Sequence, residues 1–160
     1  MKLMRLITCS ALLVFGAGVL SARAQATAPA ACPWLTQGVA ARVLGGDVSV
    51  DVHVSDAGEG YCSFARNTDA TVSLKIDVSK TAVAACGAGA MKLKGIGNEA
   101  VRCALAAADG RNVQKIASRV RDRFFTLTLS QGKGARADES DDLRNDDLEQ
   151  AAESVSGNLF

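Results

Sequence analysis

Apolar and polar residues alternate strictly over positions 48–55, and this is the most regular pattern in the chain. One side of this segment carries four valines, and the other carries Ser49, Asp51, His53 and Ser55. Successive side chains of a β-strand point to opposite faces, so the pattern predicts a half-buried strand.

Further segments of the same kind follow, separated by short turn signals. Residues 61–66 and 71–79 follow turns at 56–60 and 67–69, which predicts an antiparallel meander of three strands. Residues 99–106 are a candidate fourth strand. Residues 115–121 and 124–130 have the pattern of a hairpin that turns near Asp122. We therefore expect an antiparallel sheet of five or six strands.

Two segments have helical spacing, one at each end of this strand-rich region. Thr36 can cap a helix that runs to Leu44, and Gly45 and Gly46 would end it. A second helix is expected from near Asn145, after an acidic linker near 132–142. Its apolar stripe consists of Leu148, Ala151, Ala152, Val155 and Leu159. The predicted fold class is α+β, with both helices packed on the sheet.

The first 26 residues have the features of a secretory signal peptide. Lys2 and Arg5 precede an apolar run of 15 residues, which ends before small residues around Ala24 and Ala26. The run is shorter than the ~20 residues that span a bilayer. We expect residues 1–26 to be cleaved, leaving a single domain at 27–160 with no membrane span and a periplasmic or secreted location.

Four cysteines remain after that cleavage, and an even number in an oxidising compartment predicts two disulfides. Three pairings are possible. We favour the two that join neighbours along the chain, Cys32 with Cys62 and Cys86 with Cys103. The chain has no C-x-x-C sequence, so a thioredoxin-like redox role and a structural zinc site both lack their spacing.

The charge of the exported chain argues against a nucleic-acid partner. Loss of the signal peptide leaves 15 basic and 17 acidic residues, a net charge near −2. Nucleic acids and anionic membranes are bound through an excess of positive charge, which this domain lacks as a whole.

Two further patterns match ligand-binding motifs only in part. Residues 95–100 match the G-x-G-x-x-A form of a dinucleotide fingerprint, but they lie among antiparallel strands, so we interpret them as a tight turn that needs glycine. Residues 138–149 match the acidic positions of a calcium loop, except that Leu143 stands where glycine is required. We expect no metal and no cofactor.

His53, the single histidine, is the one candidate catalytic residue. Asp51 lies on the same face of its predicted strand, and a hydrolase would need a serine and a carboxylate arranged around the imidazole. A solvated histidine is the more common situation, so we predict that the chain is not an enzyme. Trp34, two residues after Cys32, is interpreted as core packing against a disulfide.

The best candidate for a binding surface is basic. Lys115, Arg119 and Arg121 fall on one face of a predicted strand, and Arg102 on the strand before it can join them. Such a face would suit a small anionic ligand or an acidic protein partner. The competing interpretation is that these residues pair with the acidic segment at 138–149.

A recurring set of residues resembles a known group of sequences. It consists of Cys32-x-Trp34-Leu35-Thr36, a helix ending at Leu44-Gly45, Cys62-x-Phe64, the glycine-rich turn at 95–100, and Arg119-Val120-Arg121. The set resembles an uncharacterised family of exported bacterial proteins, distantly similar to actinobacterial lipoprotein domains of unknown function. The resemblance covers about residues 32–160 and implies an α+β fold with flanking helices. It implies no catalytic residue, and the chain has no lipobox.

These observations together predict an exported, non-enzymatic binding or interaction module of the bacterial cell envelope. Two alternatives stay open, an inhibitor of an exported hydrolase and a small hydrolase that uses His53.

Overall fold

The computed structural model describes residues 31–82, 86–87, 89–106, 109–132 and 141–160, so the predicted signal peptide and most of the acidic linker lie outside the described residues. Two helices and seven strands are present among them. Their bounds are α1 Gln37–Leu44, β1 Val48–Val54, β2 Gly60–Arg66, β3 Asp69–Ser79, β4 Met91–Leu93, β5 Glu99–Ala106, β6 Asn112–Val120, β7 Arg123–Gln131 and α2 Asp141–Asn158.

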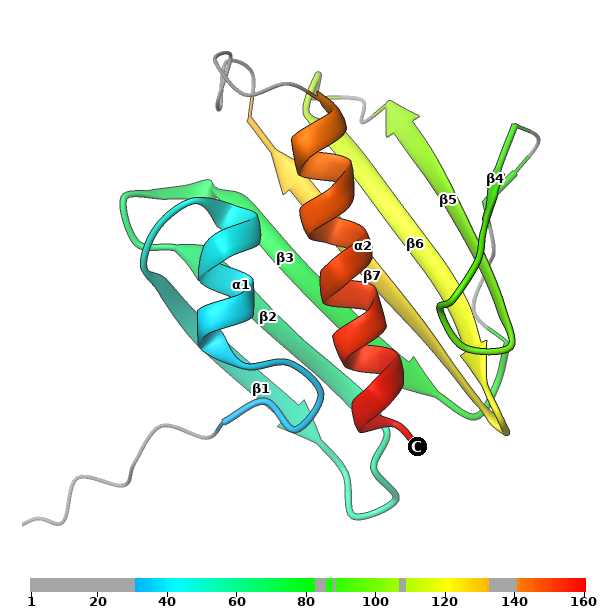
Figure 1. Ribbon diagram of the computed structural model, residues 1–160. Coiled ribbons are helices and arrows are strands. Elements are labelled where there is room, and N and C mark those ends of the chain that lie inside the picture. Colours follow the sequence, from blue (N-terminus) through cyan, green and yellow to red (C-terminus); the bar gives the residue numbers. More distant parts are fainter. Residues whose placement is uncertain (1–30, 83–85, 88, 107–108, 133–140) are drawn as a thin grey trace, which may run out of the picture.

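All seven strands form a single antiparallel sheet in the order β1-β2-β3-β7-β6-β5-β4. The first three strands form the meander that the sequence predicts. The chain then crosses to the far edge of the sheet, and β4 to β7 return strand by strand until β7 pairs with β3 (Figure 1). The sheet therefore consists of two meanders joined along their inner strands.

Both helices lie side by side on the same face of this sheet (Figure 1). The core fills the space between them and the central strands. Its strand residues include Leu74 and Ile76 of β3 and Leu127 of β7, all fully buried. Helix α2 contributes its predicted stripe, of which Leu148, Ala151, Ala152 and Val155 are buried. The apolar positions that recur at strand and helix spacing in the sequence are therefore the positions that form the core, as predicted.

The segment before α1 is fixed to the sheet by the first disulfide. Cys32 is bonded to Cys62 of β2, and Trp34, two residues after Cys32, is 4% exposed. Thr36 caps α1 by accepting a hydrogen bond from the Val39 amide, and Gly45 ends the helix with a φ of 68°. The predicted pairing of Cys32 with Cys62, the predicted helix and the predicted packing of Trp34 are confirmed.

The count of five or six strands was too low. The missed strand is β4, which has three residues and follows a stretch rich in alanine and glycine, so no alternation of useful length marks it. The second helix also begins earlier than expected, at Asp141 rather than near Asn145. Residues 141 and 142 therefore belong to α2, while residues 133–140 of the predicted linker lie outside the described part.

The glycine-rich segment at 95–100 forms a tight turn between β4 and β5 and then the first two residues of β5. Gly95 and Gly97 have φ angles of 84° and 60°, in the left-handed region that favours glycine. Between them Ile96 is 2% exposed, and its carbonyl accepts a hydrogen bond from Ser118 Oγ at 3.1 Å. No helix follows the turn, which contradicts a dinucleotide fingerprint and confirms the interpretation as a turn.

The tightness of this turn predicts unequal costs for its two glycines. A Cβ at Gly97 would lie 2.5 Å from the carbonyl oxygen of Arg119, whereas a Cβ at Gly95 meets only Glu153 Oε1 at 4.0 Å. We expect Gly95→Ala to cost about 1 kcal/mol for its dihedral angle alone, and Gly97→Ala to cost about 3 kcal/mol because backbone must also move. Urea unfolding measures both; equal losses would contradict the close approach of the Arg119 carbonyl to Gly97.

Asp69 organises the turn between β2 and β3. Its Oδ1 accepts hydrogen bonds from the Thr71 hydroxyl at 2.6 Å and the Thr71 amide at 2.9 Å, while Arg66 donates to Oδ2 at 3.2 Å. The Thr71 hydroxyl, and then the Thr71 amide, lower the pKa of Asp69 below its usual value, and Arg66 adds to the effect.

A lowered pKa in the folded state makes the turn sensitive to acid. The Asp69 carboxylate adds stability at pH values above its unfolded pKa, and this contribution is lost as the pH falls through the lower, folded pKa. We expect an NMR titration to place the Asp69 pKa below that of an exposed aspartate, and Thr71→Val to raise it by removing the hydroxyl. An unchanged pKa in Thr71→Val would show that the hydroxyl has no such role.

Candidate functional site

The face of the sheet opposite the helices carries most of the chain's candidate chemistry, and we call it the open face. Apart from the crossover between β3 and β4, no described element covers it (Figure 1). Strand register places on it Ser49, Asp51 and His53 of β1; Tyr61, Ser63 and Ala65 of β2; Ser73, Lys75, Asp77 and Ser79 of β3; Phe124, Thr126, Thr128 and Ser130 of β7; Val113, Lys115, Ala117 and Arg119 of β6; and Glu99, Val101, Cys103 and Leu105 of β5.

A polar cluster occupies the β1–β3 half of this face. His53 Nε2 lies 3.2 Å from Asp51 Oδ2, and the His53 and Tyr61 rings are 4.7 Å apart. Lys75 lies over the Tyr61 ring at 4.8 Å and pairs with Asp77 at 2.7 Å. The charged groups of this cluster are thus arranged as neighbouring pairs.

The geometry around His53 bears on the hydrolase alternative. Its imidazole has a carboxylate partner in Asp51, but the side chains are 59% and 65% exposed. Catalytic general bases usually lie in a cleft that limits access of water. His53 does not line the hollow over β5, β6 and β7 or the one over β3 and β7, and its surroundings resemble a solvated surface pair.

The other half of the open face is hollowed. A hollow of about 470 Å³ lies over the ends of β5, β6 and β7, and we call it the β5–β7 hollow. Its apolar side chains include Val101, Ala117 and Phe124, and its charged side chains are Lys92, Glu99 and Arg119. Binding sites for small molecules commonly have this volume and this mixture of apolar walls with a few polar groups.

Arg119 is the central charged group of the hollow. Its Nη2 donates to Glu99 Oε1 at 3.0 Å, whereas its Nε is buried and donates to no acceptor among the described residues. The Glu99 side chain is 76% exposed, so it can turn into solvent at little cost. Glu99 accepts a hydrogen bond from Nη2 but not from Nε. An anion with two acceptor oxygens, such as a carboxylate, would accept from both nitrogens.

The second disulfide holds the crossover against this face. Cys86 of the crossover is bonded to Cys103 of β5, as predicted, and Cys86 Sγ lies 4.0 Å from the carbonyl oxygen of Lys115. Ala82, earlier in the crossover, lines both the β5–β7 hollow and a second, more polar hollow over β3 and β7. Ala82 therefore forms part of the wall of both hollows.

The four basic residues that the sequence grouped together do not share one surface. Lys115 and Arg119 both lie on the open face of β6. Arg121 lies in the β6–β7 turn, with a φ of 56°, and its guanidinium lies 5.0 Å from the centre of the Phe160 ring.

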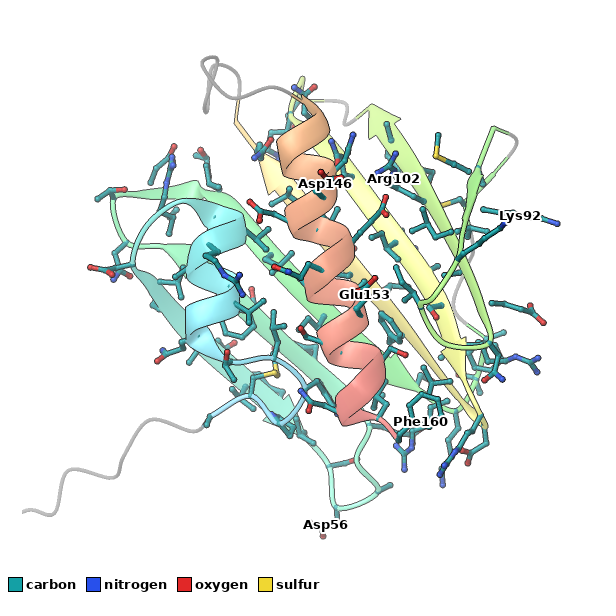
Figure 2. All side chains as sticks on the ribbon, in the orientation of Figure 1. Asp56, Lys92, Arg102, Asp146, Glu153 and Phe160 are labelled. Carbon is teal, nitrogen blue, oxygen red and sulfur yellow. A yellow bond between two sulfur atoms is a disulfide. The ribbon has the colours of Figure 1, made fainter. Side chains whose placement is uncertain are left out.

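Arg102 corrects the predicted group most clearly. It pairs with Ile116 in the sheet, so it lies on the helix-covered face, and its Nη1 donates to Glu149 Oε1 of α2 at 2.6 Å. Figure 2 shows Arg102 next to this helix. For Arg102, the competing interpretation of pairing with the acidic segment is therefore the right one.

Sequence reasoning missed most of the residues that line the hollow. Lys92 was missed because β4 was not predicted, and Figure 2 places it at that edge of the sheet. Val101 and Phe124 were assigned to strands, but nothing in their spacing says which face the helices cover. Val101 and Arg102 are neighbours, so they lie on opposite faces of β5. This contrast between an apolar and a charged side chain is the one signal in the sequence that the two faces of β5 differ.

Other candidate chemistry is not supported by the structure. The part of the chain that the structure describes has no group of three or more His, Cys, Asp or Glu residues that could hold a metal ion. Helix α2 contains Asp142, Asp146 and Glu149, which a calcium loop would need in an extended loop. No described helix is long and apolar enough to cross a membrane.

Comparison of the chain with protein-family models and with curated proteins gives no match. The function is therefore inferred from the fold and from the geometry of the open face.

The different environments of Arg102 and Arg119 predict different effects on stability. The Arg102–Glu149 pair links β5 to α2, with side chains 17% and 33% exposed, whereas the Arg119–Glu99 side chains are 43% and 76% exposed. We expect Arg102→Gln to lower the free energy of unfolding by about 1–2 kcal/mol and Arg119→Gln to change it by less than about 0.5 kcal/mol. Denaturant unfolding tests this, and a larger loss in Arg119→Gln would reverse the assignment.

Proposed function

We propose that the chain is an exported, non-enzymatic binding protein that takes up a small amphipathic anion in the β5–β7 hollow. The two disulfides support an oxidising, non-cytoplasmic compartment. A periplasmic or secreted location and the predicted cleavage at 1–26 are part of this proposal, as is the resemblance to an uncharacterised exported bacterial family.

The observation that carries the proposal is the combination of an apolar wall with an incompletely paired guanidinium. Val101, Ala117 and Phe124 offer apolar surface to a ligand, while Arg119 Nε has no acceptor in the part of the chain that the structure describes. An anionic group can accept a hydrogen bond from this donor, and a hydrogen bond between two charged groups is stronger than one between neutral groups. Lys92 at the rim adds a second positive charge.

Two alternatives predict other outcomes. An inhibitor of an exported hydrolase would form a complex with a protein and would not depend on the hollow. A hydrolase that uses His53 would lose turnover in His53→Ala and keep it in Arg119→Gln. Binding that depends on Arg119 and not on His53 separates the proposed function from both.

The first experiment is native mass spectrometry of protein purified from the periplasm, followed by titration with decanoate as the probe. Native and denatured masses reveal a retained ligand, the cleavage site and the two disulfides. We expect decanoate to bind more tightly than the neutral decanamide, and more weakly as salt is raised. Equal binding of acid and amide would contradict an anion site.

Single variants then assign the binding to the hollow. We expect Arg119→Gln to weaken decanoate binding about tenfold, as expected for the loss of a hydrogen bond to a charged group, and Lys92→Gln to weaken it less. Val101→Asp should abolish binding because it places negative charge in the apolar wall. Lys75→Gln is the matched control, since Lys75 lies on the same face but outside this hollow; equal losses in Lys75→Gln would remove the hollow as the site.

A further inference from the structure

The two edges of the sheet are built differently. The β4 edge has only three residues, and the two lysines Lys92 and Lys94 lie in or next to it. Short edge strands and lysines prevent a sheet from pairing with another chain. The β1 edge has seven residues without proline or lysine, and its register with β2 is regular throughout. Of the two edges of the described sheet, β1 is therefore the one that can accept another strand.

The backbone groups available along β1 follow from its pairing with β2. Just outside the strand ends, the Asn67 amide donates to the Asp47 carbonyl at 2.9 Å, and the Ser55 amide donates to the Glu59 carbonyl at 2.8 Å. Hydrogen-bonded positions alternate in an antiparallel pair, so the odd-numbered residues of β1 bond to β2. The amides and carbonyls of its valines, at the even-numbered positions 48 to 54, therefore point away from the sheet.

We propose that a second copy of the chain binds this edge, with the two β1 strands antiparallel about a two-fold axis at Val52. Val52 then lies opposite Val52 of the second copy, and Val50 lies opposite Val54. All these residues have outward-pointing amides and carbonyls, so each pair exchanges two hydrogen bonds. The product is a continuous sheet through both copies, and Val54, 38% exposed in the single chain, gains an apolar neighbour.

Charge and strand length favour this register over those centred on Asp51 and on Val50. Centring on Val52 places Asp51 opposite His53 of the second copy, in a non-hydrogen-bonded pair where side chains approach most closely. Because of the two-fold symmetry, the contact between Asp51 and His53 occurs twice in the dimer. Centring on Asp51 would bring two carboxylates together, which is unfavourable. Centring on Val50 would leave Asp51 opposite Ser49, and Val54 opposite Gly46 beyond the end of the strand.

The open face keeps its ligand site in this dimer. The β5–β7 hollow lies at the other end of the sheet from β1, with β2 and β3 between them. The dimer contact and the ligand site can therefore be tested separately.

Sedimentation of the full exported chain, from micromolar to millimolar concentration, tests the dimer. We expect a reversible monomer–dimer equilibrium. The contact is made by one edge strand of seven residues from each copy, and small interfaces are typical of weak association. His53→Asp should weaken it about tenfold or more by placing two aspartates opposite each other twice. The exchange variant Asp51→Lys/His53→Asp should restore the association. Ser73→Asp, which adds the same charge to the open face away from the edge, should leave it unchanged.

Cysteine cross-linking then reports the register. Asp51→Cys mixed with His53→Cys should form an intermolecular disulfide, because directly opposite positions satisfy the distance that a disulfide needs. Either variant alone should give little cross-linking. The proposal is overturned by a wild-type chain that stays monomeric at millimolar concentration, by equal association of wild type and His53→Asp, or by cross-linking confined to Asp51→Cys alone.

Discussion

The structure depends on the antiparallel pairing of β3 with β7. These two strands are the inner strands of two meanders, each continuous in sequence, and no other pair of described strands joins the two meanders. Helix α2 lies in front of the central strands (Figure 1), and its small and branched residues, among them Ala151, Ala152 and Val155, are fully buried. Two buried side chains of the junction, Ile76 and Leu127, are opposite each other in the register. The junction and α2 together make one core from two halves.

The β3–β7 junction joins residues far apart in the chain, whereas single strands and helices depend on near neighbours. This difference explains which parts of the fold could be predicted from the sequence. The strands with strict alternation, such as β1 and β3, and the helix capped by Thr36 are encoded by near neighbours, so they were predictable. The pairing of Cys86 with Cys103 was also predictable, as one of three possibilities. Strand β4 was missed because three residues contain no period, and its place at the sheet edge follows from the crossover rather than from its own sequence.

The candidate site was only partly predictable for a related reason. Arg102 and Arg119 are both arginines on neighbouring strands, yet one contacts α2 and the other lines the β5–β7 hollow. Their difference is set by which face of the sheet the helices cover, and this depends on contacts between residues far apart in the chain. Charge pattern alone finds the arginines but cannot separate a structural ion pair from a binding group.

The positions of the two disulfides have a consequence for how the chain folds. Cys32–Cys62 lies within the first meander and its leading helix, and Cys86–Cys103 lies within the crossover and the second meander. Neither bond crosses the β3–β7 junction, and each closes a short loop, of 30 and 17 residues in sequence separation. Oxidation can therefore be completed in each half before the halves dock. Any other pairing of these cysteines would link the two halves covalently and restrict the search for the correct register between β3 and β7.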